Sequence, residues 1–313
     1  MVYRLARRNL YESAPGVQVV GEPSENKIMR RDTAAKWALS IFLAALPPSL
    51  VRAAGPPIPE IDGAFDRLYN FDFAGSHRIL NGYIAAHPGE ALPYAARASA
   101  YLFYELDRLG VLESQFLTDD KQILEKRKIA PDPVIRAEFF KAVGEAQARA
   151  ERTLAAAPDD PNSLLAMCIG YGVVSDYTAL VEKRQFRSMS PAKSANLYAQ
   201  RLLRLKPPLY DAYVSTGVSE YLVGSLPIFL RWFVRFDNIK GSKQEAVKNL
   251  ERVSREGHYL KGFAKVLLSI IYLREKKREA AVAMLAELQR EYPANPLFRR
   301  ELAQLSSRPR QTP

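Results

Sequence analysis

The sequence predicts an all-α fold, a right-handed solenoid of about five irregular helix pairs. First, a small residue recurs with an apolar residue four positions later, as close helix packing requires: Ser76, Ala146, Ala195, Ala246 and Ala281. Second, the residue twelve positions after each small residue is proline in four cases and His258 in the fifth, which indicates a helix end. Third, the small residues are spaced by 70, 49, 51 and 35 residues, as expected for repeated units with insertions.

The helical array is expected to begin at residue 61, after a proline-rich linker at residues 54–60. A first helix pair is expected over residues 61–71 and 74–86, and a long helix rich in Ala and Tyr over residues 91–112. The irregular residues 113–133 are interpreted as an insert on the surface, with a functional loop as the alternative.

Four further helices are expected over residues 134–157, 163–181, 190–205 and 209–223, the second of them capped by Asn162. A very apolar segment follows at residues 228–236, which we interpret as an inserted helix buried in the solenoid. Docking on a membrane interface is the alternative, through a patch of Arg231, Trp232, Phe233 and Arg235. A helix started by Ser242 and a last unit over residues 259–305 complete a helical domain of residues 61–306.

The last unit carries the clearest motif. Leu268, Ser269 and Tyr272 stand where a tetratricopeptide first helix places Leu, Gly and Tyr, and its second-helix positions hold Ala281, Leu285, Leu288 and Pro293. The chain therefore resembles the tetratricopeptide repeat superfamily over residues 61–305, closely in this unit and loosely before it. The unit departs from the motif where Lys265 replaces Trp, Ser269 replaces Gly and Leu285 replaces Phe. The resemblance implies stacked helix pairs whose first helices line a concave groove.

Residues 1–53 differ from the rest of the chain. Met29-Arg30-Arg31 precedes an apolar run at residues 38–46 and a small-residue site at residues 51–53, which is the order of a secretory signal. We expect a signal peptide at residues 29–53, and a start-codon artefact or disordered tail at residues 1–28. The mature protein is then expected in the periplasm or cell envelope. An inner-membrane anchor at residues 34–51 is the alternative, and residues 307–313 are expected to be a disordered tail.

The residue inventory argues against catalytic and metal sites. Cys168 is the only cysteine, so it forms no intramolecular disulfide and is interpreted as a buried apolar residue. His77, His87 and His258 are the only histidines and belong to different units, so no paired-histidine zinc motif is present. No glycine-rich phosphate loop or nucleophile elbow appears. We expect no metal, no cofactor and no catalytic residue, and therefore a protein that is not an enzyme.

The charge is unevenly distributed. The net charge is +11, from 45 Lys and Arg against 34 Asp and Glu, and the basic excess lies within residues 182–310. We interpret this excess as the solvated outer face of amphipathic helices, with contact to an anionic membrane surface as the alternative. Aromatic residues do not alternate with the basic ones as in a nucleic-acid module, so no nucleic-acid partner is expected.

Tyrosine is the residue that points to a binding surface. The chain has 16 tyrosines, and Tyr171, Tyr177, Tyr213 and Tyr221 lie on expected first helices. Tyrosine offers a rigid amphipathic contact, although packing between helices explains the same positions. We expect an exported, non-catalytic interaction scaffold that binds a peptide or protein surface in its groove. The alternative is a ligand- or lipid-binding accessory protein of an envelope transporter, similar to the periplasmic tetratricopeptide partners of tripartite transporters, which requires an apolar cavity.

Overall fold

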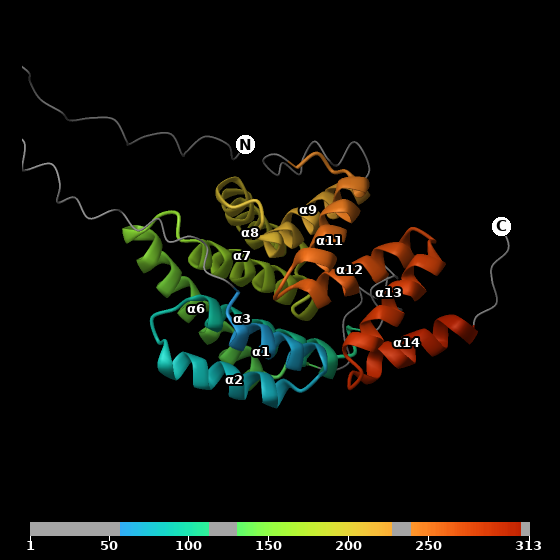
Figure 1. The fold of residues 1–313 in the computed structure, drawn as a ribbon, viewed down its shortest axis with the longest axis horizontal. Coiled ribbons are helices and arrows are strands. Elements are labelled where there is room, and N and C mark those ends of the chain that lie inside the picture. The colour runs from blue at the N-terminus through green and yellow to red at the C-terminus, as the bar shows by residue number, and fades with distance from the viewer. Residues whose placement is uncertain (1–56, 113–129, 227–238, 308–313) are drawn as a thin grey trace, which may run out of the picture. The chain divides into compact units, whose positions relative to one another are not determined.

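The structure is a computed structural model that describes residues 57–112, 130–226 and 239–307. In these ranges all regular secondary structure is helical, so the predicted all-α class is confirmed for them (Figure 1). Four predictions concern segments that lie outside the described residues, in whole or for the most part. They are the leader at residues 1–53, the insert at residues 113–133, the apolar segment at residues 228–236 and the C-terminal tail.

The helices follow one another in pairs (Figure 1). The first helices are α1 (Pro59–Tyr69), α3 (Leu92–Arg108), α7 (Pro161–Asp176), α9 (Tyr213–Ser225) and α12 (Lys261–Arg274). The second helices are α2 (Phe73–Ala86), α6 (Pro133–Ala156), α8 (Gln185–Leu205), α11 (Lys243–Glu256) and α13 (Arg278–Glu291). Each second helix packs on its own first helix and on the first helix of the next pair. The final helix, α14 (Pro296–Ser307), packs on α13.

The sequence pattern identified the packing positions and the ends of the second helices. All five small residues of the pattern are buried, with an exposed fraction of at most 3%. Each second helix ends two residues before the predicted stop, as α13 ends at Glu291 before Pro293. The two features share a cause, because a small side chain lets two helices approach closely and proline cannot continue a helix.

Two local predictions need correction. Helix α7 begins at Pro161 and is capped by Asp160, whose side chain accepts from the Ser163 N–H at 2.8 Å, so Asn162 is not the cap. An aspartate followed by proline is the stronger start signal of the two. The helix continues past Asp176 as one π-helical turn, Tyr177–Val181. Helix α8 starts before the predicted residue 190, and Pro191 lies inside it, where it removes one intrahelical hydrogen bond.

Two buried glutamates hold the pairs whose connections are not described. Glu105 of α3 is fully buried, and its carboxylate accepts from Arg108 at 2.7 and 2.8 Å and from the Asp132 N–H at 2.9 Å. Glu220 of α9 accepts from the N–H groups of Lys240 at 3.2 Å and Ser242 at 2.7 Å. Each glutamate on a first helix thus fixes the backbone that leads into its second helix.

The first and last units of the described array contact each other. The Tyr69 hydroxyl, at the end of α1, donates to the Tyr259 carbonyl at 2.8 Å, and the Asn295 side-chain amide donates to the Tyr69 carbonyl at 2.7 Å. The rings of Phe103 in α3 and Phe263 in α12 meet edge to face at 5.5 Å. Units of a plain solenoid contact only their sequence neighbours, so this closure is an additional feature of the chain.

Candidate ligand pocket

The first helices converge on one pocket, which we call the central pocket. It has a volume of about 120 Å³ and is lined by residues of α1, α3, α7, α9 and α12, together with two alanines of α8. The wall is mostly apolar and includes the rings of Phe65, Tyr69 and Phe103. The pocket therefore lies among the first helices, next to the contact between the two ends of the described array.

Small residues keep the central pocket open. A Cβ atom added at Gly172 of α7 would meet no heavy atom within 4 Å, apart from the helix backbone and chain neighbours. Ala192 and Ala195 of α8 line the same space. Because none of these residues carries a long side chain, the helices pack closely without filling the space between them.

Asp176, at the end of α7, is the one charged side chain among the described residues that line this pocket. The residue is partly buried, and it borders the pocket. In the described part of the chain, its carboxyl group has no hydrogen-bond or ion-pair partner. Burial disfavours the ionised form, and with no donor to offset this effect the pKa of Asp176 rises to about 7.

The other polar groups of the central pocket are mostly paired within the protein. The Ser99 hydroxyl donates to the Ala95 carbonyl at 3.1 Å, and the Ser175 hydroxyl donates to the Ser188 carbonyl at 3.1 Å. The Cys168 sulfur lies 3.1 Å from the Ser215 hydroxyl oxygen. Burial raises the pKa of Cys168 to about 11, so at neutral pH it is a protonated thiol, as expected of a buried apolar residue.

Two of the predicted groove tyrosines are buried in helix contacts. Tyr177 is fully buried and stacks on Phe139 at 4.6 Å between ring centroids. Its hydroxyl oxygen has no hydrogen-bond partner in the described residues. Tyr221 is 9% exposed, and its hydroxyl donates to the Glu275 carboxylate at 3.3 Å. Both side chains are used in packing, and neither lines the central pocket.

The other two tyrosines remain half-buried. Tyr171 stacks on Tyr198 at 5.8 Å, and Tyr213 stacks on Tyr210 at 6.4 Å with the Arg252 guanidinium 4.6 Å from its ring centroid. Neither of them lines the central pocket. Their role as binding residues stays a prediction, and the proposed patch of Arg231, Trp232, Phe233 and Arg235 lies outside the described residues.

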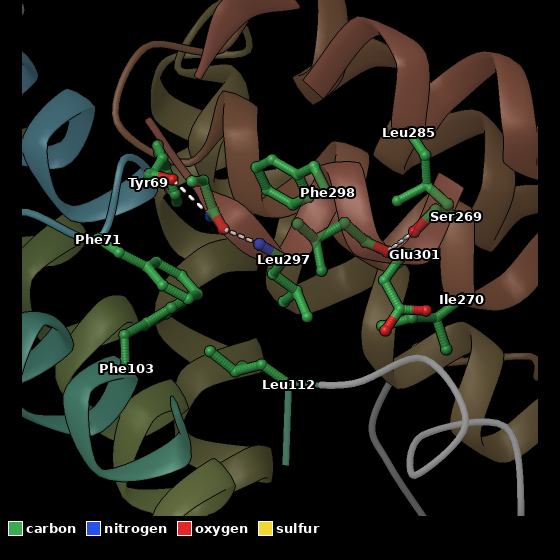
Figure 2. A pocket seen from close by; sticks show the side chains of 12 residues that line it. Tyr69, Phe71, Phe103, Leu112, Ser269, Ile270, Leu285, Leu297, Phe298 and Glu301 are labelled. Atoms are coloured by element: carbon green, nitrogen blue, oxygen red, sulfur yellow. Dashed lines mark hydrogen bonds between the residues drawn. The ribbon is translucent and has the colours of Figure 1, made fainter. Parts of the chain in front are cut away.

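A second apolar pocket adjoins the same closure. Figure 2 shows Phe71, Leu112, Leu297 and Phe298 around a space of about 40 Å³. Tyr69 and Phe103 line both this pocket and the central one. A volume of this size holds a few waters at most, since one water needs roughly 10–15 Å³ by this measure. The central pocket is therefore the better candidate for an organic ligand.

A polar groove between α3 and α6 is larger, at about 200 Å³, and its charged groups other than Arg97, whose buried Nε has no hydrogen-bond partner in the described residues, pair with one another. Arg149 forms an ion pair with Glu145 and lies over the Tyr94 ring, 4.0 Å from its centroid. Arg97 donates to the Asn81 side-chain oxygen at 2.6 Å. These contacts fix the side chains in place, so the groove is accounted for by the packing of α3 on α6.

Two further properties of the described residues bear on function. They contain no group of three or more His, Cys, Asp or Glu side chains that could hold a metal ion. One helical segment, Pro161–Val181, is long and apolar enough to cross a membrane by length and composition. Most of that segment is buried among the other helices, which is also the pattern of a core helix in a globular domain.

Asp176 had a signal in the sequence that our prediction did not use. It is the only charged residue between Ser163 and Val181, in a segment that is otherwise apolar or weakly polar. An isolated acid on a buried helix requires either a partner in the fold or a function.

No family model, curated protein or solved structure matches this chain.

Proposed function

We propose that this chain is a non-catalytic binding protein that holds a small, largely apolar molecule in the central pocket. One observation carries the proposal: the first helices meet around an apolar space that contains a carboxyl group without a partner among the described residues. An apolar pocket with few polar groups, one of them with a perturbed pKa, is the usual form of a small-molecule site. This proposal corresponds to the ligand-binding alternative of the sequence analysis.

The size of the pocket limits the ligand. Its volume of about 120 Å³ is close to that of engineered apolar cavities, ~150 Å³, that bind benzene. A single aromatic ring or a short branched chain fits such a space, whereas a long acyl chain exceeds it. Burial of the ligand against Phe65, Tyr69 and Phe103 would supply the affinity, at roughly 25 cal/mol per Å² of apolar surface.

Thermal unfolding in the presence of benzene tests the proposal with two glycine variants. Gly172→Leu places a side chain in the open space of the pocket, whereas Gly144→Leu makes the same change at an exposed, open position of α6. Both substitutions increase helix propensity by a similar amount. Benzene at ten times its Kd adds about 1.4 kcal/mol, which is about 3–6 °C in Tm for a domain of this size.

The expected result is stabilisation of the wild type and of Gly144→Leu, and none of Gly172→Leu. Equal stabilisation of all three proteins would locate the benzene site elsewhere. Absence of any effect on the wild type would show that the pocket does not accept an apolar ligand. Either of these results overturns the proposal.

We also propose that the helix pairs are tetratricopeptide-like repeats, wound as a right-handed solenoid of about five units. The motif positions Leu268, Tyr272 and Ala281 support this assignment, because all three are buried where α12 and α13 pack. The shared end position of the second helices supports it as well.

The signal-like order of residues 29–53 supports export of the protein. A Met1 terminus on the native protein in a cytosolic fraction would contradict the proposal of export.

A protein-interaction scaffold remains the second candidate function. The half-buried ring pairs Tyr171–Tyr198 and Tyr210–Tyr213 favour it, because partly exposed tyrosines are common anchors at interfaces. Affinity capture from a cell-envelope extract compares the wild type with the Tyr171→Ala, Tyr213→Ala variant. A protein retained by the wild type, lost in the variant and unaffected by benzene would favour the scaffold over the ligand-binding protein.

A further inference from the structure

We propose that the ligand of the central pocket carries a protonated amine that pairs with the carboxylate of Asp176, attached to an apolar body of about one ring. This inference rests on the proposed ligand-binding function and specifies the chemical class of the ligand. A primary aryl-alkyl amine such as benzylamine represents the class.

The charges of the pocket favour a cation. Among the described residues that line it, Asp176 is an acid and no residue is Lys, Arg or His. The remaining titratable groups are Cys168 and Tyr69, and the Tyr69 hydroxyl already donates to the Tyr259 carbonyl. An anionic ligand would meet a second negative charge without a compensating cation, and at short range in a low dielectric that repulsion is large.

The missing partner of Asp176 favours a donor on the ligand. Each other buried carboxyl group described above has its oxygens satisfied within the protein, as Glu105 does through Arg108 and Asp132. An ammonium group has three N–H donors and a full charge, so it can satisfy the carboxylate and offset its desolvation. A hydroxyl group supplies one hydrogen bond and no positive charge, so it leaves the negative charge of the carboxylate without a counter-charge.

The walls around Asp176 favour an aromatic or branched apolar body. Three aromatic side chains, Phe65, Tyr69 and Phe103, belong to the same pocket, and the space near Gly172 is open. Aromatic faces attract both apolar groups and cations, so this wall suits a ring that carries an ammonium group. The elevated pKa of Asp176, about 7, agrees with a carboxyl group that still lacks the cation stabilising its ionised form.

Isothermal titration at pH 7.5 with three probes that share a phenyl ring and differ in charge tests the inference. Benzylamine is cationic, benzyl alcohol is neutral and benzoate is anionic. We expect wild-type protein to bind benzylamine at least tenfold more tightly than benzyl alcohol, and benzoate more weakly than either. This comparison requires no substitution, so it remains decisive even if a variant fails to fold.

Two variants locate the preference. Asp176→Asn keeps the shape of the side chain and removes its charge, whereas Asp159→Asn makes the same change at an exposed aspartate of the α6–α7 turn. We expect Asp176→Asn to bind both probes within twofold of each other, through loss of benzylamine affinity alone. The Asp159→Asn variant should keep the wild-type preference.

The outcomes separate the two proposals. Equal affinities of benzylamine and benzyl alcohol for the wild type would overturn the amine assignment and leave the ligand-binding function intact. A preference that survives in Asp176→Asn would overturn the role of that carboxylate. Failure of all three probes to bind the wild type would overturn the ligand-binding function as well.

Discussion

Two sets of buried acids in this chain differ in what surrounds them. Glu105, Glu220 and Asp211 each accept hydrogen bonds from backbone N–H groups, and Asp211 holds the chain at His258 and Leu260 with bonds of 3.2 and 2.7 Å. Asp176 is only partly buried, has no partner in the described residues and borders an open space. Each of the first three acids joins two segments of the array by hydrogen bonds, whereas Asp176 forms no such bond in the described residues.

The presence or absence of hydrogen-bond partners distinguishes structural acids from candidate functional acids more clearly than burial alone does. A buried carboxyl group with its acceptors used is explained by the fold, since losing it would leave donors unpaired. A buried carboxyl group without partners costs stability, and a bound ligand that supplies a donor would offset that cost. Substitutions at Asp176 and at Glu105 test the two cases separately.

The largest effect is expected from Asp176→Asn in ligand-free protein. The folded-state pKa of about 7 lies above the ordinary value of ~3.9, so the folded state binds the proton more tightly than the unfolded state. Asp176 therefore destabilises the fold increasingly as pH rises from about 4 to 7, and the cost is constant above that. At 1.36 kcal/mol per unit, the full cost is about 4 kcal/mol.

Urea unfolding of both proteins from pH 4 to pH 8 measures this effect. The variant should be more stable than the wild type at pH 8, and the difference should vanish towards pH 4. Asp62, Asp66 and Asp211 also have raised pKa values, mainly through burial, but they are present in both proteins and cancel in the difference. A pH-independent difference would mean that the Asp176 carboxylate is as well solvated in the folded state as in the unfolded state, and a wild type that gains stability over the variant as pH rises would mean that the carboxylate is paired.

Glu105 should behave in the opposite way. Glu105→Ala removes the acceptor of the Asp132 N–H and of the Arg108 guanidinium, although Arg108 keeps a bond to the Ala130 carbonyl at 2.7 Å. Leaving these donors unpaired in a buried site should destabilise the protein by about 3 kcal/mol. Urea unfolding at pH 7 measures the loss, and Glu105→Gln, which keeps one acceptor oxygen, should lose about half as much. A raised Glu105→Ala midpoint would place this acid in the same class as Asp176, and an unchanged one would mean that its hydrogen bonds add no net stability.

The sequence predicted the features that depend on local rules. Helix ends follow from proline, and close helix contacts follow from small residues such as Ala146 and Ala281, because both rules act within one or two helices. The contact of Tyr69 with Asn295 joins residues 226 positions apart and carries no periodic signal. The central pocket depends on that closure, so its residues could not be chosen from repeat positions alone. Tyr177 illustrates the limit, since tyrosine on a first helix suits a groove and a core equally well.

The contact between α1 and α12 bounds the central pocket, and Gly262→Ala tests whether these two helices touch. A Cβ atom at Gly262 of α12 would lie 2.7 and 2.8 Å from carbons of the Tyr69 ring and 3.0 Å from the Tyr292 hydroxyl oxygen. Tyr69 is itself buried and cannot move freely, so this overpacking should cost about 1–2 kcal/mol despite the better helix propensity of alanine. Gly82→Ala, at an open and exposed position of α2, should instead stabilise the protein by about 0.5–1 kcal/mol. Stabilisation by both variants, measured by urea unfolding, would mean that α1 and α12 do not touch as described.

The smallest effect is expected on the basic outer surface. Lys276 and Lys277 are exposed at the turn between α12 and α13, and the double change to glutamate reverses two charges of the basic half of the chain. Neither side chain lines the central pocket, and exposed charges are screened over about 8 Å at physiological salt. The free energy of unfolding should change by no more than about 0.5 kcal/mol, as for most surface substitutions. Benzylamine affinity at ~0.15 M salt should stay within twofold of the wild type, because the interaction with Asp176 is local and salt screens the distant charges. A tenfold gain in benzylamine affinity would show that the outer charges reach the site, and that the selectivity of the pocket is not set by Asp176 alone.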